Sequence, residues 1–274
     1  MDVIPHSREL PRGGRLHLEF RTAMPHSIQV HLLPKLVDPS EFAGGVTVVI
    51  DILRASTTMI HALAAGALGV FPCGETDEAR KRAATYPARS CVLGGERGGV
   101  LIDGFDLGNT PTDYTPATVG GKTVVFTTTN GTRALVHARR SARVVVGAFA
   151  NLSAVARWLA EADRPAHLLC AGTDGHITLE DALFAGAVLH ALARGGAPLE
   201  PTGDSARLAW TAWASVAADP DEFLTRMAGS RGGTNLVELG LGGDVRTCAR
   251  IDTCDVVPEL GADGLLRSQS GSSF

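Results

Sequence analysis

The sequence predicts an α/β protein with three layers, α/β/α, built on a largely parallel or mixed sheet. Short apolar runs alternate with longer stretches of helical apolar spacing from Ile28 onward, a pattern that places helices on both faces of a sheet. Several of these runs are continuously apolar, as is typical of strands covered on both faces. The 274 residues, 45% of them hydrophobic, suffice for a substantial core.

The expected elements follow one another along the chain. Continuous apolar runs predict strands at residues 28–32, 46–53, 69–72, 90–93, 123–127, 143–146 and 166–170. Apolar residues at helical spacing predict helices at 57–65, 77–86, 131–139, 152–162, 179–194, 205–217 and 221–227. Residues 94–115, rich in Gly, Asp, Asn and Pro, interrupt the pattern, and an irregular segment of that length is usually functional or disordered.

Composition and segment boundaries restrict the possible functions. Residues 1–27, rich in Arg, Pro and His, predict a flexible lead-in to one functional domain at 28–274, and the pattern allows two lobes with a boundary near 114–121. A net charge of −4 and a pI near 6.1 argue against a nucleic-acid partner. The absence of a long apolar run argues against a membrane span. Five cysteines without a CxxC pair favour a reducing, cytoplasmic setting.

The first polar segment follows the apolar run 46–50 and carries Asp51, Arg54, Ser56 and Thr57. Ligands of open α/β sheets bind beyond the carboxyl ends of strands, where the next helix presents unpaired N–H groups. Helix capping alone explains the two hydroxyls, but a carboxylate directly after a buried strand is costly without a partner. We therefore expect Asp51 and Arg54 to serve an anionic ligand and a metal ion, which makes phosphate chemistry the first hypothesis.

Glycines surround Glu96 and Arg97 in the second segment, GGERGG, which continues to Asp106 and Asn109. Glycine lets a ligand approach the backbone and its N–H groups closely. Arg97 is expected to clamp the phosphate or a second anionic group, since a planar guanidinium suits both. Glu96 or Asp106 is a candidate donor of the proton to the leaving alcohol, and Asn109 is a candidate substrate contact. A loop with ordinary turn residues is the alternative interpretation.

The third segment places Thr129, Asn130, Gly131 and Thr132 between an apolar strand and an apolar helix. Hydroxyl and amide groups at a helix start supply donors aligned with the positive end of the helix dipole. We expect these residues to complete a phosphate cradle. The segment is not a Walker loop, because no GxxxxGK[ST] pattern is present, and simple capping of the helix remains an alternative.

The fourth segment, CAGTDG, leads into Glu180 and Asp181 at the start of a helix of small residues. An inward-facing Asp181 requires a metal or cation partner, whereas the helix dipole alone explains Glu180. Mg²⁺ binds through one or two protein carboxylates and keeps several waters. The predicted metal ligands are therefore Asp51 and Asp181, with Glu180 in reserve. Either a metal-oriented water or Asp51 itself would attack phosphorus.

Cys91 and Arg97 formally match the CX5R loop of cysteine-dependent phosphatases, in which a thiolate attacks phosphorus. The motif fixes only two positions, and a glutamate inside the loop would repel phosphate. A cysteine nucleophile is therefore kept as an alternative to the metal-dependent mechanism. A phosphate-binding homologue without turnover is a second alternative.

The four segments together, in this order, resemble the 2-phosphosulfolactate phosphatase family. The matching stretches are VVIDILRASTT, GGERGGVLIDGFDLGNTP, FTTTNGTRAL and CAGTDGHITLEDALFAGAV, and SRGGTNLVELGLGGDV resembles the closing segment of the family. The resemblance implies an α/β/α fold, a homodimer and a Mg²⁺-dependent phosphatase acting on a small phosphorylated sulfo- or carboxylic acid. In its best-known setting the family makes sulfolactate on the way to coenzyme M.

Overall fold

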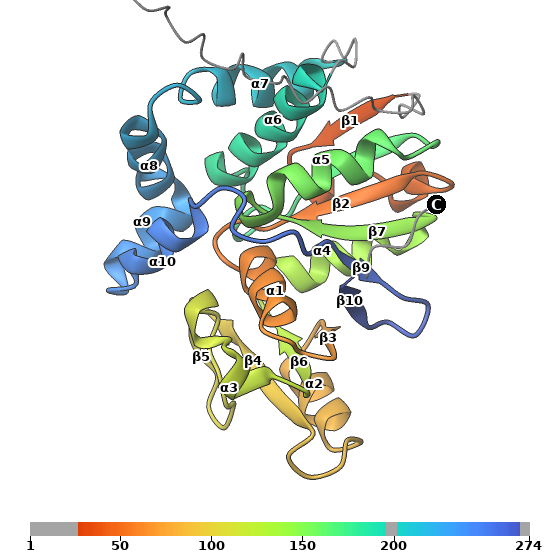
Figure 1. Ribbon diagram of the computed structural model, residues 1–274, viewed down its shortest axis with the longest axis vertical. Coiled ribbons are helices and arrows are strands. Elements are labelled where there is room, and N and C mark those ends of the chain that lie inside the picture. The colour runs from red at the N-terminus through yellow and green to blue at the C-terminus, as the bar shows by residue number, and fades with distance from the viewer. Residues whose placement is uncertain (1–26, 196–201, 269–274) are drawn as a thin grey trace, which may run out of the picture.

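One mixed sheet runs through the part of the chain that the computed structural model describes, residues 27–195 and 202–268. Within these residues it has ten strands in the order β1-β8-β2-β7-β9-β10-β3-β6-β4-β5 (Figure 1). The strands are β1 (Ile28–His31), β2 (Val46–Ile50), β3 (Gly69–Cys73), β4 (Cys91–Arg97), β5 (Val100–Leu101), β6 (Thr123–Thr127), β7 (Arg143–Gly147), β8 (Ala166–Cys170), β9 (Pro258–Leu260) and β10 (Leu266–Ser268). The expected lead-in lies outside the described residues, except for residue 27.

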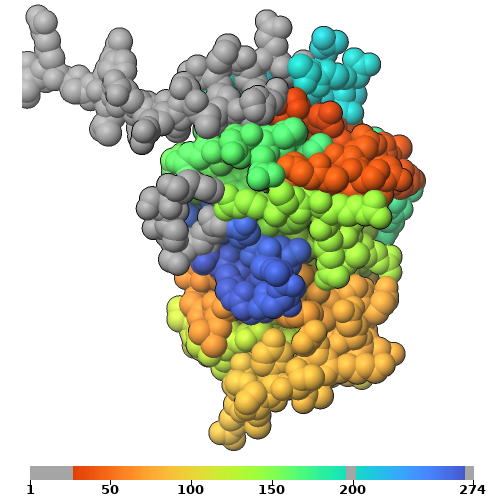
Figure 2. Space-filling model, turned by 90° about the vertical axis from the view of Figure 1, so that its right-hand side faces the viewer, coloured from red at the N-terminus to blue at the C-terminus, as the bar shows by residue number. Residues whose placement is uncertain are grey.

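The sheet consists of two parallel blocks joined by an antiparallel hairpin. Strands β1, β8, β2 and β7 form the first block, and β3, β6 and β4 form the second. Strand β9 pairs with β7, and β10 pairs with β3. Figure 2 shows this hairpin as a blue patch between the red and green first block and the orange second block. The mixed sheet confirms the predicted fold class.

Helices cover both faces of the sheet in three layers, with α6 against β2 and β8 and α2 against β4 and β6. Helices α8, α9 and α10 extend from this core as an arm on the side of β5 (Figure 1). The helices are α1 (Ala55–Ala64), α2 (Thr76–Ala83), α3 (Pro116–Val119), α4 (Gly131–His137), α5 (Leu152–Ala160), α6 (Leu179–Arg194), α7 (Asp204–Ala214), α8 (Pro220–Gly229), α9 (Arg231–Glu238) and α10 (Gly242–Cys248). None of the described helices has the length and apolar character needed to cross a membrane.

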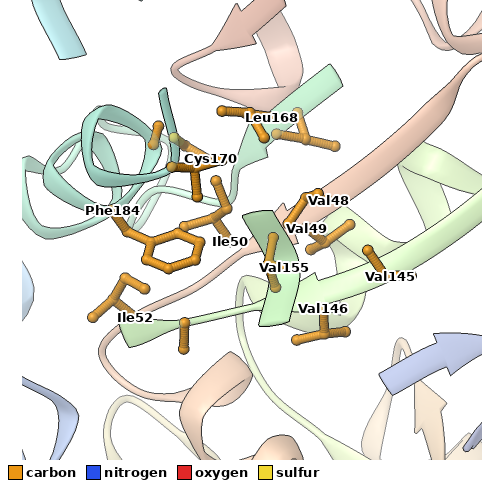
Figure 3. Close-up of a cluster of buried hydrophobic side chains, with 14 of the residues drawn as sticks. Val48, Val49, Ile50, Ile52, Val145, Val146, Val155, Leu168, Cys170 and Phe184 are labelled. Carbon is orange, nitrogen blue, oxygen red and sulfur yellow. The ribbon is translucent and has the colours of Figure 1, made fainter. Parts of the chain in front are cut away.

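The core explains why the strands are continuously apolar. Every residue of β2 is buried, and its Val48, Val49 and Ile50 lie between neighbouring strands and the helices above them (Figure 3). Phe184 of α6 packs on this layer and meets Phe149 edge to face, with ring centroids 5.3 Å apart. Each fully buried side chain of this size contributes about 1.5–3 kcal/mol of hydrophobic free energy. The packed core fixes the strand ends that carry the polar segments.

Several element boundaries differ from those the sequence predicts. Strand β2 ends at Ile50 and α1 begins at Ala55, so Ser56 and Thr57 lie inside the helix rather than capping it. Strand β4 continues to Arg97, four residues beyond the expected end, because its glycines allow the chain to pair closely with β6. Strands β9 and β10 were not expected, since three residues each are too few for a visible period. The division into two lobes stays a prediction.

Candidate active site

A cleft of about 330 Å³ lies at the carboxyl ends of β2 and β6, below the β4–β5 turn and beside α9. Each of the four polar segments contributes to its wall, as the strand-end rule requires. Leu53 was not singled out from the sequence, and the residues of α9 were noted only through the resemblance of their segment, because this glycine-rich stretch has few large apolar residues. The lining residues are Asp51, Leu53, Arg54, Glu96, Gly98, Gly99, Asn109, Thr129, Asn130, Thr173, Asp174, Gly232, Asn235, Leu236, Glu238 and Leu239.

Asp51 occupies the end of β2 and is 8% exposed. Its Oδ1 accepts a hydrogen bond from the Ala55 N–H at 3.2 Å, whereas Oδ2 has no such partner among the described residues. Burial, followed by the charges of Glu96 and Glu180, raises the pKa of Asp51 to about 7 against the opposing effect of Arg54. Because its negative charge is disfavoured here, the Asp51 carboxylate is stabilised when a proton or a metal ion neutralises it.

Gly131 makes the close approach of α4 to Asp51 possible. A Cβ at this position would lie 2.7 Å from Asp51 Oδ2 and 2.7 Å from the Ala55 side chain. Only glycine leaves the necessary space. Gly131, expected to belong to the phosphate cradle, does not line the cleft and instead allows α4 to approach Asp51 closely.

Asp181 is buried beside the same strand end, where it connects two loops. Its Oδ1 accepts from the Ile52 N–H at 2.9 Å, and its Oδ2 accepts from the Gly172 N–H at 3.0 Å. Burial and the charges of Glu180 and Asp51 hold the pKa of Asp181 well above its ordinary value. Both oxygens thus join the loop after β2 to the loop after β8, which makes Asp181 a supporting residue in this structure.

Glu180 is 1% exposed and keeps one oxygen unused. Oε1 accepts from the Gly232 N–H at 3.1 Å, while Oε2 is buried without a hydrogen-bond partner in the described part of the chain. A Cβ at Gly232 would clash with Oε1, so α9 packs directly on this carboxyl group. Burial raises the pKa of Glu180. An orphaned buried oxygen beneath two cleft residues, Gly232 and Leu53, is suited to a cation.

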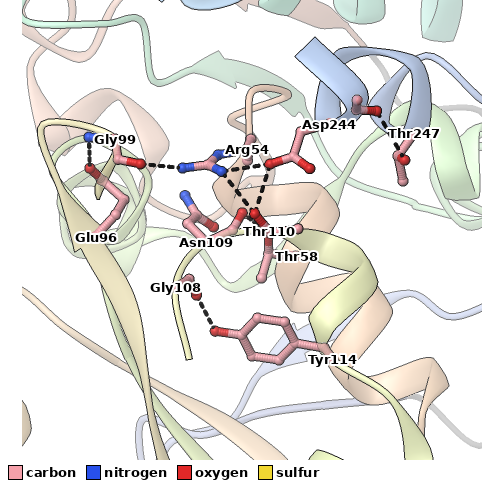
Figure 4. A network of polar contacts seen from close by, with 11 residues as sticks. Arg54, Thr58, Glu96, Gly99, Gly108, Asn109, Thr110, Tyr114, Asp244 and Thr247 are labelled. Atoms are coloured by element: carbon pink, nitrogen blue, oxygen red, sulfur yellow. Dashed lines mark hydrogen bonds and ion pairs between the residues drawn. The ribbon is translucent and has the colours of Figure 1, made fainter. Parts of the chain in front are cut away.

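Arg54 forms a buried polar clamp with Asp244, Thr110 and Gly99 (Figure 4). Its Nη1 lies 2.6 Å from Asp244 Oδ2 and donates to Thr110 Oγ1 at 3.2 Å, and its Nη2 donates to the Gly99 carbonyl at 2.8 Å. The side chains of Arg54 and Asp244 are only 2% and 8% exposed. This Arg54 clamp ties α1 to the β4–β5 turn and to α10. Apart from the resemblance of its segment, no sequence pattern pointed to Asp244.

The Glu96 carboxylate also accepts hydrogen bonds from neighbouring backbone N–H groups. Its Oε1 accepts from the Thr129 N–H at 2.8 Å, and its Oε2 accepts from the Gly99 N–H at 2.7 Å. Two charge-assisted hydrogen bonds fix the tight β4–β5 turn against the loop after β6. Glu96 therefore shapes the cleft wall while it adds negative charge to the site.

Eight of the predicted site residues do not line the cleft: Gly131, Glu180 and Asp181, described above, and five more whose side chains bond within the protein. Successive side chains of a strand point to opposite faces, so Arg97 leaves the cleft that Glu96 enters and donates to Thr127 Oγ1 at 2.9 Å. Arg97 therefore forms hydrogen bonds within the protein and not the ligand contact that the sequence predicted. The others are Asp106, bonded to the Leu93 N–H; Ser56, to the Asp51 N–H; Thr57, to the Ile52 carbonyl; and Thr132, to the Thr128 carbonyl.

The expected amide and hydroxyl contacts do line the cleft. Asn109 is 5% exposed and its Oδ1 is buried without a partner among the described residues. Asn130 Oδ1 accepts from the Asp174 N–H at 3.3 Å, which leaves its Nδ2 available as a donor. Thr129 stands beside Glu96. The cleft thus offers amide groups from two different loops to a polar ligand.

Cys91 and Arg97 stand at opposite ends of the same strand, β4. A strand rises about 3.3 Å per residue, so their Cα atoms lie roughly 20 Å apart and do not form a phosphate-binding loop. Burial also raises the pKa of the Cys91 thiol, which disfavours the thiolate. The geometry speaks against the cysteine-nucleophile alternative.

Negative charge dominates the cleft. Its lining includes Asp51, Glu96, Asp174 and Glu238, against the single guanidinium of Arg54, which is already paired. In the described residues no three His, Cys, Asp or Glu side chains converge as a ready metal cage. Asp51 Oδ2 and Glu180 Oε2 nevertheless remain without partners, and Mg²⁺ needs only one or two carboxylates besides water. The donor set fits a hydrated divalent cation.

Fold and cleft together define an α/β/α protein with an acidic ligand site at its strand ends. The sequence model of the family described as 2-phosphosulpholactate phosphatase matches residues 31–263. The chain therefore belongs to the 2-phosphosulfolactate phosphatase family, a family of phosphoric monoester hydrolases.

Relatives with the same description extend across distant bacteria. A "probable 2-phosphosulfolactate phosphatase" of Symbiobacterium thermophilum is 42% identical over 80% of this chain and 92% of its own. Proteins described in the same words from a Synechococcus species and from Caldanaerobacter subterraneus are 39% and 35% identical, over 84% and 81% of this chain and 95% and 89% of theirs. The whole domain is thus shared with these proteins.

Proposed function

We propose that this protein is a Mg²⁺-dependent phosphatase that hydrolyses 2-phosphosulfolactate or a related 2-phospho-hydroxy acid. The family and the names of the relatives support phosphomonoester hydrolysis. The observation that carries the metal requirement is the charge of the cleft, four carboxylates against one ion-paired guanidinium. A phosphorylated acid has several negative charges and would be repelled unless a cation entered with it.

Asp51 and Glu180 would hold the Mg²⁺ ion, with water completing its shell. The bound ion would neutralise phosphoryl oxygens and favour deprotonation of water. Asp51 sits where the attacking group must be oriented, and its own carboxylate is the alternative nucleophile. Asn109 and Asn130 supply amide donors for phosphoryl oxygens, and Arg54 forms the positively charged wall opposite them. Asp181 and Glu96 keep these loops in place through their backbone hydrogen bonds.

A panel of phosphorylated hydroxy acids, assayed with EDTA and with added Mg²⁺, tests the proposal. Phosphate release should vanish with EDTA, return with Mg²⁺ and favour substrates with a second anionic group. Alkylation of cysteines should leave turnover unchanged. Turnover that survives EDTA would refute the metal requirement. Binding of the panel without turnover would instead support the non-catalytic alternative.

We further propose a homodimer in a reducing cytoplasm. Val100, Leu101, Val237 and Leu239 are between 43% and 55% exposed around the cleft mouth, an apolar surface suited to a second copy. All five cysteines are free thiols. Light scattering should give twice the monomer mass, and a monomer at micromolar concentration would contradict the dimer.

A further inference from the structure

A second pocket, of about 260 Å³, lies between α1, α10 and the residues that follow α10. Its polar lining comprises His61 of α1, Thr247 of α10, and Arg250 and Thr253 just beyond α10. It shares no lining residue with the acidic cleft. The proposed phosphatase mechanism uses none of the residues that line this pocket.

The charge of this second pocket is opposite to that of the cleft. No acidic residue lines it, and the exposed guanidinium of Arg250 has no hydrogen-bond or ion-pair partner in the part of the chain that the structure describes. After burial, the charge of Arg250 is the next cause that lowers the pKa of His61, whereas a hydrogen bond with the Pro111 backbone acts in the opposite direction. Arg250 and His61 therefore line the same pocket, and no carboxylate is among its lining residues.

We propose that the second pocket binds a phosphate-sized dianion between Arg250 and His61. A guanidinium presents a planar set of donors that matches two oxygens of such an ion. A protonated imidazole would face the remaining charge, and the hydroxyl of Thr253 would supply a neutral donor, whereas the Thr247 hydroxyl already donates to the Gly243 carbonyl at 3.3 Å. The anion would neutralise the charge of Arg250 and favour protonation of His61, so the site would compensate the anion without a metal.

Short connections lead from this pocket to the Arg54 clamp. Thr247 stands three residues after Asp244 on α10, and Pro111, whose backbone interacts with His61, directly follows Thr110. Asp244 and Thr110 are both direct partners of Arg54. An occupant of the second pocket would therefore contact α10 directly and reach the segment of Thr110 and Pro111 through His61.

Titration with inorganic phosphate, followed through the imidazole resonance of His61, tests the proposal. The resonance is assigned by its loss in the His61→Gln variant. Phosphate should shift it saturably and raise the apparent pKa of His61. Arg250→Gln should weaken this binding at least about tenfold, as expected for the loss of charge-assisted hydrogen bonds. Arg246→Gln is the matched control, because Arg246 is exposed on α10 and does not line the pocket.

The variants also separate this pocket from the cleft, where phosphate is a reaction product. A shift transmitted from the cleft would persist unchanged in Arg250→Gln, and that result would overturn the proposal. An unshifted His61 resonance at saturating phosphate would overturn it as well. Methanesulfonate, a monoanion of similar size, should bind more weakly, and equal binding would overturn the preference for a dianion. Arg250 has no structural partner, so Arg250→Gln should fold normally.

Discussion

The acidic cleft and the second pocket are assigned ligands of the same sign although their own charges are opposite. The cleft has four carboxylates and one guanidinium that is already paired, whereas the second pocket has an unpaired guanidinium and no carboxylate. Excess negative charge in the cleft fits a reaction on phosphate in which a bound cation takes part. Excess positive charge fits simple binding. The charge of a pocket therefore indicates whether an anionic ligand needs a cation beside it. It does not by itself indicate the sign of the ligand.

The largest expected effect comes from removing the charge at the end of β2. Asp51→Asn should lower kcat by about 10³-fold or more, since the proposed mechanism places this carboxylate at the reacting atoms. Its thermal stability should stay the same or rise, because the buried carboxylate is crowded by other acids. Phosphate release and thermal melting measure the two effects. Near-normal turnover would remove Asp51 from the mechanism.

The Arg54 clamp joins α1 and α10, two helices that also contribute residues to the second pocket, and it should be the next most sensitive point. Asp244→Ala leaves a buried guanidinium without its partner and should cost about 3–5 kcal/mol of unfolding free energy. Glu222→Ala, which breaks the exposed pair with Arg226, serves as the control and should cost only about 0.5 kcal/mol. Urea unfolding compares them, and equal losses would contradict a clamp that stabilises the fold.

The acidic cleft should make metal binding depend on pH. In the metal-free protein the raised pKa of Asp51, about 7, means that the folded state holds a proton that the unfolded state has released. Its contribution to stability is therefore complete below the ordinary carboxyl pKa and is lost as pH rises toward 7. Mg²⁺ replaces that proton, so the gain in melting temperature should be larger at about pH 8 than at about pH 6. Asp51→Asn should weaken this dependence, and a gain independent of pH would contradict it.

The smallest effect is expected at Cys91, which lines neither pocket. Cys91→Ser changes a side chain that contacts the Ala83 carbonyl and lies at the far end of β4 from the cleft. Turnover should match the wild type, in the same assay as for Asp51→Asn. A loss comparable with that of Asp51→Asn would revive the cysteine nucleophile.

The sequence predicted what depends on local periodicity and on strand ends. Buried runs such as 123–127 identified parallel strands, and each polar segment that followed such a run reached the cleft. It predicted less well which side chain of a segment enters the cleft. Glu96 and Arg97 are equally polar neighbours, and only the extension of β4 and the alternation of its side chains separate them. Ser56 and Thr57 bond to the backbone instead, because α1 begins earlier than the hydroxyls suggested.

Pairs of residues far apart in the chain could not be predicted from the sequence, for a different reason. Arg54 and Asp244 are 190 residues apart, and no local pattern records which acid will neutralise a given guanidinium. The same holds for Glu180 and Gly232, whose contact depends on how α9 packs on α6. Helix α9 itself comes from a glycine-rich stretch in which apolar spacing is weak. Tertiary packing, rather than propensity, places these partners.

The hairpin of β9 and β10 has a mechanical consequence for catalysis. The first block supplies Asp51 and the second supplies Glu96, so the two walls of the cleft are anchored on opposite sides of that hairpin. Among the described residues, strand pairing joins it to each block at one residue pair, Val145 with Glu259 and Val70 with Leu266, and Arg143 reinforces one side through two hydrogen bonds to Glu259. A small shear along this seam would alter the separation of Asp51 and Glu96. Residues of the hairpin thus contribute to the spacing of the cleft walls without touching either carboxylate, alongside the Arg54–Gly99 hydrogen bond that joins the walls directly.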